Sequence, residues 1–315
     1  MKVAIVGTGI AGNVAAYHLN KQHDITVFEA GAWVGGHTNT IDVPTNQGPL
    51  PVDTGFIVFN DRTYPNFIHL LDQLGVESQD SEMSFSVRRD TPLLEYNGST
   101  LNGLFAQRSN VLRPSFHRMI RDILRFNREA PRLLESGRAG QTLGYFLDQG
   151  GYGKEFRNDY LIPMGAAIWS AEPQMMLSMP ARFFIQFFLN HGLLSLDDRP
   201  TWRVIRGGSR EYVKKLVADH RDRIRLNCPV ESITRLPDQV IVRAHGAPAE
   251  RVDAVFLACH SDPALRLLSV PTPTEPDLLG AIRCPYNEAV LQTDASLMPP
   301  RSRAWASWNS RLRGA

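Results

Sequence analysis

The first thirty residues alternate between short apolar runs and a glycine-containing turn. Lys2–Val6 is aliphatic without alternation, which predicts a strand buried on both faces. Asn13–Lys21 carries apolar residues at helical spacing and predicts a helix, and Asp24–Phe28 predicts a second buried strand. The order strand, helix, strand indicates an α/β fold built on a parallel sheet.

The turn between the first strand and the helix has the spacing GxGxxG. Gly7 allows a tight turn, Gly9 lets the backbone approach a pyrophosphate, and Gly12 lets the helix pack close to the strand. The helix N-terminus offers free N–H groups to phosphates, and Glu29 ends the second strand, where it can accept hydrogen bonds from a ribose. The alternative is a glycine-rich turn without a ligand. The residues expected at the dinucleotide are Gly7, Gly9, Ile10, Ala11, Gly12, Glu29 and Ala30.

A second pair of glycines, Gly35-Gly36, follows the acidic residue and is continued by His37-Thr38-Asn39-Thr40. This segment resembles the Gly-Gly-Arg-x-x-Thr pattern of the FAD-dependent amine oxidase superfamily, which includes monoamine oxidases, protoporphyrinogen oxidase and phytoene desaturase-like enzymes. The resemblance implies FAD as the cofactor, with Gly35, Gly36, His37 and Thr38 close to it, and disfavours an NAD-dependent dehydrogenase. His37 replaces the arginine of the pattern, so it lacks a permanent charge and a bidentate donor.

The segment after the second glycine pair extends the resemblance. Pro51–Val58, with a predicted helix over Tyr64–Gly75, resembles the segment that passes the isoalloxazine ring, which implies that Gly55, Phe56 and Ile57 lie near the flavin. The chain is most similar to bacterial NAD/FAD-binding amine-oxidase-like flavoproteins.

The second half of the chain also matches the pattern of these flavoproteins. Arg206-Gly207-Gly208-Ser209 resembles a family helix entry, and the backbone of Val230, between predicted strands at Arg223–Asn227 and Gln239–Arg243, is implied to meet the adenine. Asp253–Cys259 resembles a late strand of the family, with Cys259-His260 in place of Thr-Pro.

The pattern predicts two domains. We expect residues 1–75 and 200–272 to form a Rossmann-like FAD-binding domain. Residues 76–199 are too many for a loop, so they predict an inserted α+β substrate domain, to which residues 273–315 return through a proline-rich linker. The elements expected there are a strand pair at Met83–Arg89 and Leu93–Tyr96, a long helix at Ser115–Ser136, shorter helices within Gly144–Tyr160, and strands at Asn287–Gln292 and Ala304–Trp308.

Composition excludes several classes of protein. The formal charge of +2 and the 43% hydrophobic residues are typical of a globular chain and not of a nucleic-acid binder. Three cysteines at wide spacing fit neither a disulfide framework nor a zinc site, so we expect no metal. The apolar N-terminal run is broken by glycines and lacks a cleavage site, and no apolar run is long enough to span a membrane. These features predict a cytoplasmic protein.

Few side chains are candidates for chemistry, because a flavin itself accepts the hydride. His260, at the end of a cofactor-side strand, is the titratable candidate, and a packed or loop histidine is the alternative interpretation. Cys259 is interpreted as a structural thiol rather than a flavin attachment point.

Two stretches bear on the substrate. An aromatic and methionine-rich run between Met175 and Phe188 is interpreted as domain core or as the wall of a tunnel for a lipid-like molecule. Arginines at helical spacing form either a solvated helix face or a site for peripheral contact with anionic membrane. They are Arg118, Arg121, Arg125, Arg128 and Arg132.

The late Gly-Asp or Gly-Glu motif that closes the FAD site in this superfamily is not found after Cys259. We therefore expect a C-terminally shortened chain with weakened FAD retention. The sequence favours an FAD-dependent oxidoreductase acting on a C–N or C–C bond of an apolar small molecule or lipid. The alternative is a flavin-binding or degenerate module without turnover.

Overall fold

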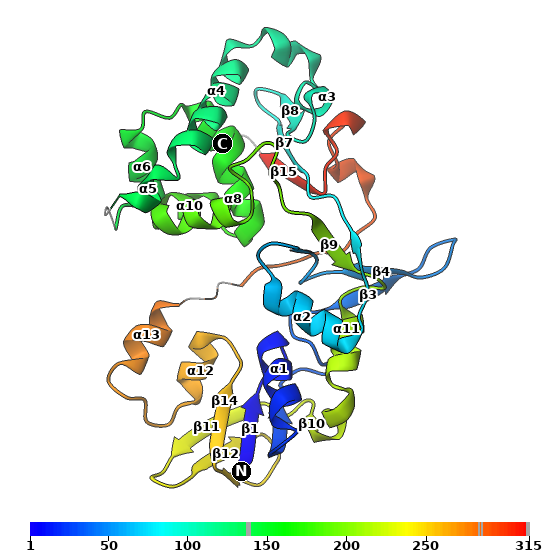
Figure 1. Ribbon diagram of the computed structural model, residues 1–315, viewed down its shortest axis with the longest axis vertical. Coiled ribbons are helices and arrows are strands. Elements are labelled where there is room, and N and C mark those ends of the chain that lie inside the picture. The colour runs from blue at the N-terminus through cyan, green and yellow to red at the C-terminus, as the bar shows by residue number, and fades with distance from the viewer. Residues whose placement is uncertain (137–139, 283, 285, 313–315) are drawn as a thin grey trace. The chain divides into compact units, whose positions relative to one another are not determined.

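The computed structural model describes residues 1–136, 140–282, 284 and 286–312 and contains two compact units (Figure 1). Unit 1 comprises Met1–Val58, Asn66–Gln79 and Val204–Leu291. Unit 2 comprises Phe59–Pro65, Asp80–Arg203 and Gln292–Ala315. Both units are therefore assembled from segments far apart in the sequence.

Unit 1 is built on a four-stranded parallel sheet with the order β10-β2-β1-β14. The central strands β1 (Lys2–Val6) and β2 (Asp24–Phe28) have the bounds that the apolar runs predict. The outer strands β14 (Ala254–Leu257) and β10 (Ile224–Arg225) are shorter than predicted. All four strands therefore end at one edge of the sheet, where the glycine turn lies.

The two faces of this sheet are covered by different layers. Val3 and Ile5 pack with Ala16 of helix α1 (Ile10–Leu19), whereas Ala4 faces an antiparallel sheet. The sequence predicts only the middle strand of this second sheet, over Gln239–Arg243, and places Val230, the first residue of the first strand, in a connection. Its strands are β11 (Val230–Arg235), β12 (Val240–Ala244) and β13 (Glu250–Val252).

The proline-rich stretch after β14 is helical rather than a linker to unit 2. Helix α12 (Ser261–Leu267) packs against α13 (Glu275–Ala281), and both belong to unit 1. The structure therefore places the return to unit 2 after Leu291, whereas the sequence suggested residue 272. Proline occupies the first turn of α13, where its missing N–H costs no hydrogen bond.

The remainder of unit 1 surrounds the glycine turn. The segment Pro51–Val58 is a strand only as far as Asp53, and this strand forms a hairpin with the preceding one. Helices α2 and α11 meet through an edge-to-face contact of Phe67 and Tyr212, with ring centroids 5.3 Å apart. These elements are β3 (Thr40–Val43), β4 (Leu50–Asp53), α2 (Pro65–Leu74), α11 (Arg210–Leu216) and the 3-10 turn η3 (Ala218–Arg223).

Unit 2 contains a three-stranded sheet with the order β15-β7-β8. β7 (Phe85–Arg89) and β8 (Leu94–Asn97) form the expected antiparallel pair, and β15 (Trp308–Leu312) lies parallel to β7. The strands expected at Asn287–Gln292 and Ala304–Trp308 are wrong. Within the described residues, the first segment has no regular structure, and the second begins in a 3-10 turn and joins the sheet only at Trp308, the first residue of β15.

The long helix expected at Ser115–Ser136 is two helices, because Pro131 has no N–H for the helical ladder. Phe126, Phe156, Phe184 and Phe188 fill the helical core of unit 2. The helices are α3 (Leu101–Leu104), η1 (Arg108–Leu112), α4 (Pro114–Glu129), α5 (Arg132–Glu135), α6 (Leu143–Gln149), α7 (Lys154–Phe156), the π-helical η2 (Arg157–Leu161), α8 (Ile162–Trp169), α9 (Pro173–Ser178) and α10 (Ala181–Asn190).

Three short strands lie where the chain changes units, and two short turns precede β15. They are β5 (Phe59–Asn60), β6 (Ser78–Asp80), β9 (Trp202–Ile205), η4 (Ala295–Leu297) and η5 (Ser302–Ala304). Across the described chain, no helix has the length and apolarity needed to cross a bilayer.

Candidate cofactor site

The glycine turn is held between the ends of β2 and β14. Gly7 has a φ of +104°, and its N–H donates to the carbonyl of Phe28 at 2.8 Å. A side chain at Gly7 would place its Cβ 2.9 Å from the carbonyl oxygen of Ala258. Both the left-handed conformation and this close approach require glycine.

Gly9 and Gly12 serve different purposes. A Cβ on Gly12 would lie 1.9 Å from the carbonyl oxygen of Gly7, so this glycine is required for the helix to pack on the strand. A Cβ on Gly9 would meet no atom within 4 Å, and Gly9 has an ordinary extended conformation (φ −64°, ψ 179°). The fold itself therefore does not require glycine at this position. The open space above Gly9 lies at the N-terminus of α1, whose first N–H groups have no acceptor within the helix.

Glu29 closes the other side of the turn. Its carboxylate accepts hydrogen bonds from the Thr8 N–H at 2.8 Å, from the Thr8 hydroxyl at 2.5 Å, and from the Gly31 N–H at 2.7 Å. Thr8 is fully buried, and the Asn13 amide donates to its carbonyl at 2.6 Å. The sequence gave no signal for these two residues, because Thr8 occupies a variable position of GxGxxG and Asn13 follows the motif.

The second glycine pair packs directly on the first turn. A Cβ on Gly36 would lie 3.0 Å from Cα of Gly9, and the Gly35 N–H donates to the Thr8 carbonyl at 3.0 Å. The buried Thr38 hydroxyl is 2.5 Å from the Tyr212 hydroxyl, so this hydrogen bond ties the turn to helix α11. The structure thus brings Gly36 and Gly9, 27 residues apart in the sequence, into contact.

The segment expected beside the flavin lies against His37. The Phe56 N–H donates to the His37 carbonyl at 2.9 Å, and a Cβ on Gly55 would lie 2.1 Å from the same oxygen. The Phe56 ring packs edge to face on Phe67, with centroids 5.3 Å apart, and the Ile57 side chain is exposed. Gly55 and Phe56 are therefore fixed beside the glycine turns, and Ile57 is left open.

Asp53 and Ser209 connect this segment to the second glycine-rich helix entry. The Ser209 N–H donates to Oδ1 of Asp53 at 2.9 Å, and the Ser209 hydroxyl bonds to Asp53 and to the Phe56 carbonyl. Gly208 has a φ of +91°, and a Cβ on this residue would clash with the Thr40 side chain. The sequence indicated the Gly207-Gly208 pair but gave no signal for the Asp53 contact, because its partner lies 156 residues away.

The segment before β11 runs beside Glu29. The N–H of Cys228 donates to the Glu29 carbonyl at 2.8 Å, and the N–H of Asn227 donates to the Gly31 carbonyl at 2.9 Å. The Val230 side chain packs into the core with Phe28. The half-buried Val230 thus lies close to the end of β2 and to Glu29.

His260 follows β14 and stacks on His37, with ring centroids 5.4 Å apart. The preceding Cys259 is half-buried, and burial raises the pKa of its thiol, so it is a poor nucleophile.

His260 also lies near Asp262 and Cys284, and the ligand atoms of these three residues are all within 4.8 Å of one another. The sequence gave no sign of this cluster, because Cys284 lies more than twenty residues after the other two and outside any helix or strand. Its nitrogen, oxygen and sulfur donors suit a soft divalent cation such as zinc. Both His260 and Cys284 are exposed, and no further observation points to a bound ion.

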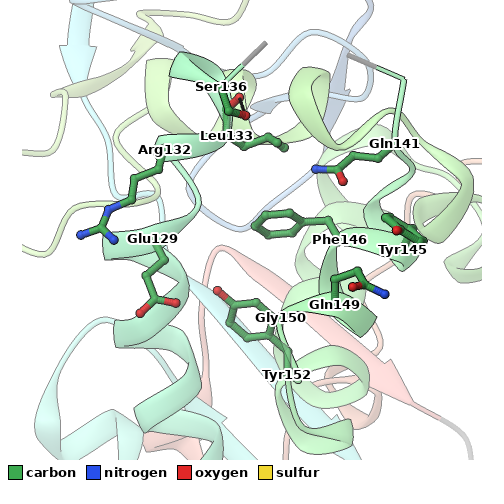
Figure 2. A pocket seen from close by; sticks show the side chains of 10 residues that line it. All are labelled: Glu129, Arg132, Leu133, Ser136, Gln141, Tyr145, Phe146, Gln149, Gly150 and Tyr152. Carbon is green, nitrogen blue, oxygen red and sulfur yellow. Dashed lines mark hydrogen bonds between the residues drawn. The ribbon is translucent and has the colours of Figure 1, made fainter. Parts of the chain in front are cut away.

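Unit 2 has a cavity of its own, about 420 Å³ in volume, between the end of α4 with α5 on one side and α6 on the other. Figure 2 shows the Phe146 ring and the Tyr152 hydroxyl directed into the hollow, and the Arg132 guanidinium directed away from it. The Arg125 guanidinium covers Tyr152 at 4.1 Å, and burial raises the pKa of Tyr152 to about 12. The cavity combines an aromatic wall with amide side chains.

The two substrate-related stretches have mainly structural roles. Met176, Phe184 and Phe188 are fully buried, which favours the core interpretation over a tunnel wall. Three of the five arginines on α4 and α5 are neutralised by Glu155, Asp122 and Glu129. Among the described residues, no ion pair involves the remaining two, Arg121 and Arg132.

The family comparison fits this geometry. Residues 10–300 match the family described as flavin containing amine oxidoreductase. The chain belongs to this family. The flavin-containing family agrees with the FAD cofactor that the glycine motifs predict. A comparison with curated proteins gives no significant match.

Several solved structures share the fold. Putrescine oxidase, in a structure bound to putrescine, is 20% identical with a TM-score of 0.66, covering 89% of this chain and 63% of its own. Cyclohexylamine oxidase from Brevibacterium oxydans IH-35A is 19% identical with a TM-score of 0.67, covering 89% and 62%. A CLA-producing fatty acid isomerase from P. acnes is 16% identical with a TM-score of 0.61, covering 88% and 63%. The chain thus spans less than two thirds of the length of these structures.

Proposed function

We propose that this family member is an FAD-dependent oxidoreductase. The observation that carries the proposal is the open space above Gly9. A Cβ there would touch nothing, although Gly12 and Gly36 on either side are tightly packed. Neither packing nor backbone conformation requires glycine at this position. Such a glycine is expected where a ligand approaches the backbone.

In this proposal the N-terminus of α1 and the glycine turns hold the pyrophosphate. His37 donates one hydrogen bond there, Glu29 meets the adenosine ribose through its remaining acceptor capacity, and the Val230 backbone meets the adenine. Gly55, Phe56 and Ile57 lie toward the flavin ring, which supplies hydride acceptance when bound. Unit 1 is then the FAD-binding domain and unit 2 the substrate domain. The residues proposed to hold the cofactor are Gly7, Gly9, Ile10, Ala11, Gly12, Glu29, Ala30, Gly35, Gly36, His37, Thr38, Gly55, Phe56, Ile57 and Val230.

The proposed substrate is an apolar small molecule or lipid that is oxidised at a C–N or C–C bond. Putrescine oxidase and cyclohexylamine oxidase support the C–N bond, and the fatty acid isomerase supports a lipid chain. His260 is the proposed titratable residue at the site, since it stacks on His37. A module that binds flavin without turnover is the second candidate, favoured by the replacement of the family arginine at His37.

The absorption spectrum of the purified protein tests both candidates. Visible bands of oxidised flavin that bleach anaerobically with an amine or a fatty acid support the oxidoreductase. Bands that no substrate bleaches support the binding module. A colourless protein that also fails to take up added FAD contradicts both.

A further inference from the structure

Unit 2 carries a second cavity, about 670 Å³ in volume, whose lining is strongly basic. It lies where η1 (Arg108–Leu112) meets the segment that contains η5 (Ser302–Ala304). In Figure 1 this segment, drawn in red, lies beside α3 and β8, and both elements contact η5. The polar lining residues are Gln107, Arg108, Ser109, Arg301, Ser302 and Arg303.

The charges of this cavity are not balanced. Arg301 forms an ion pair with Glu95, whose side chain is fully buried. Arg108 donates only to neutral groups, the Phe105 carbonyl and the Asn102 side chain. Within the described chain, neither Arg108 nor Arg303 has an acidic partner. Two uncompensated guanidinium groups beside two serine hydroxyls suit an oxyanion, which guanidinium groups bind in a bidentate manner.

Large exposed aliphatic side chains lie close in sequence to residues of this cavity or to their partners. Leu112 and Val111, on the same turn as Arg108, are 86% and 49% exposed. Leu101, next to the Asn102 that binds Arg108, is 77% exposed. Exposed aliphatic residues beside basic residues are typical of surfaces that enter the interface of an anionic bilayer.

We propose that this cavity binds the phosphate of an anionic phospholipid headgroup, with Leu101, Val111 and Leu112 contacting the lipid interface. The membrane contact proposed here is therefore the α3–η1–η5 region, and not the arginines at helical spacing on α4 and α5. It does not depend on the cofactor or on turnover. A site for a free oxyanion is the competing explanation.

Sedimentation of the full chain with vesicles tests the proposal. We expect the protein to bind phosphatidylglycerol/phosphatidylcholine vesicles and not vesicles of phosphatidylcholine alone. Arg108→Gln with Arg303→Gln removes two exposed charges and is expected to lower binding roughly thirtyfold, at about 1 kcal/mol per basic residue near an anionic surface. The matched control, Arg121→Gln with Arg132→Gln, removes two exposed, unpaired arginines elsewhere in unit 2 and is expected to bind like the wild type.

A second variant tests the lipid part of the proposal. Leu112→Ser changes no charge and no buried contact, and it is expected to weaken vesicle binding at least several-fold. Binding of inorganic phosphate, measured by calorimetry, is expected to be unchanged in this variant. The proposal is overturned if the wild type does not prefer the anionic vesicles, if the control pair loses as much binding as the cavity pair, or if Leu112→Ser has no effect. Far-UV circular dichroism of each variant excludes unfolding as the cause of any loss.

Discussion

The imidazole rings of His37 and His260 are stacked, with centroids 5.4 Å apart and planes inclined by 16°. His37 follows the second glycine pair, and His260 follows the end of strand β14. His37 stands where the family pattern has an arginine. The stack therefore joins two positions at which this chain departs from the family pattern, because Cys259-His260 stands in place of Thr-Pro.

Substitution of His37 by arginine is expected to strengthen FAD binding. A charged donor contributes about 1.5–3 kcal/mol where a neutral donor contributes about 0.5–1.5, so the gain is about 1 kcal/mol, or roughly fivefold in affinity. Titration with FAD, followed by quenching of flavin fluorescence, measures it. His37→Gln keeps a single neutral donor and serves as the control. Equal affinities of the arginine and glutamine variants would show that residue 37 does not reach the phosphates.

Gly9→Val is expected to abolish FAD uptake and to leave the free protein as stable as the wild type. The side chain has open space and an allowed backbone conformation in the free protein, but it occupies the place of the pyrophosphate. Flavin content after reconstitution and the thermal midpoint of the free protein are the measurements.

Gly12→Ala is the matched control for the glycine turn. Its Cβ would lie 1.9 Å from a backbone oxygen, so we expect a large loss of stability even without FAD. A Gly9→Val protein with normal flavin content contradicts the proposed site, and so does one that unfolds like Gly12→Ala.

Glu29→Ala is expected to destabilise the free protein as well as to weaken FAD binding. The buried Thr8 N–H would lose its acceptor, which costs about 1–3 kcal/mol in the free energy of unfolding. Urea unfolding without cofactor measures this loss. Glu29→Gln keeps one carbonyl acceptor and is expected to recover part of the stability. Affinities for FAD and FMN separate the second role, because only FAD carries the adenosine; equal losses for both would remove Glu29 from the ribose site.

Protein stability is expected to fall as the pH decreases below about 6.5, in part because of His220. This side chain is fully buried, and neither ring nitrogen has a hydrogen-bond partner within the described structure. Burial lowers the pKa of His220, although Asp219 and Asp222 oppose the shift. The folded state therefore binds fewer protons than the unfolded state, and the contribution is complete above the unfolded pKa of 6.5 and is lost as the pH falls below it.

The free energy of unfolding in urea at about pH 7.5 and pH 5.5 tests this expectation. His220→Leu removes the titrating group, so its stability is expected to change less between the two values than that of the wild type. The difference between the proteins should stay constant from pH 8 to 9, where imidazole no longer titrates. A wild type and variant with the same pH dependence would contradict the prediction.

Local patterns predicted the elements around the glycine turn well. β1 and β2 have the predicted bounds, because each begins at an exposed charged residue, Lys2 or Asp24, and continues through mostly apolar, buried residues. Helix α1 begins at Ile10, three residues before the prediction, because Gly12 is a packing glycine inside the helix and not part of the turn.

Contacts across long sequence distances were not predictable. Asp53 with Ser209, and His37 with His260, depend on the closure of unit 1 and have no local signature. The strand prediction at Asn287–Gln292 failed for the same reason: apolar content predicts a strand only where a neighbouring edge is present, and Val290 is 72% exposed.

The order of synthesis constrains how this chain folds. β1 is synthesised long before its partner β14, which begins at Ala254, and β7 is synthesised long before β15, which begins at Trp308. Each unit therefore keeps an unpaired strand edge until these partners are made, and such edges are templates for association with other chains. Because non-local pairing also slows folding, these edges stay open for longer than in a fold whose strands pair with their near neighbours.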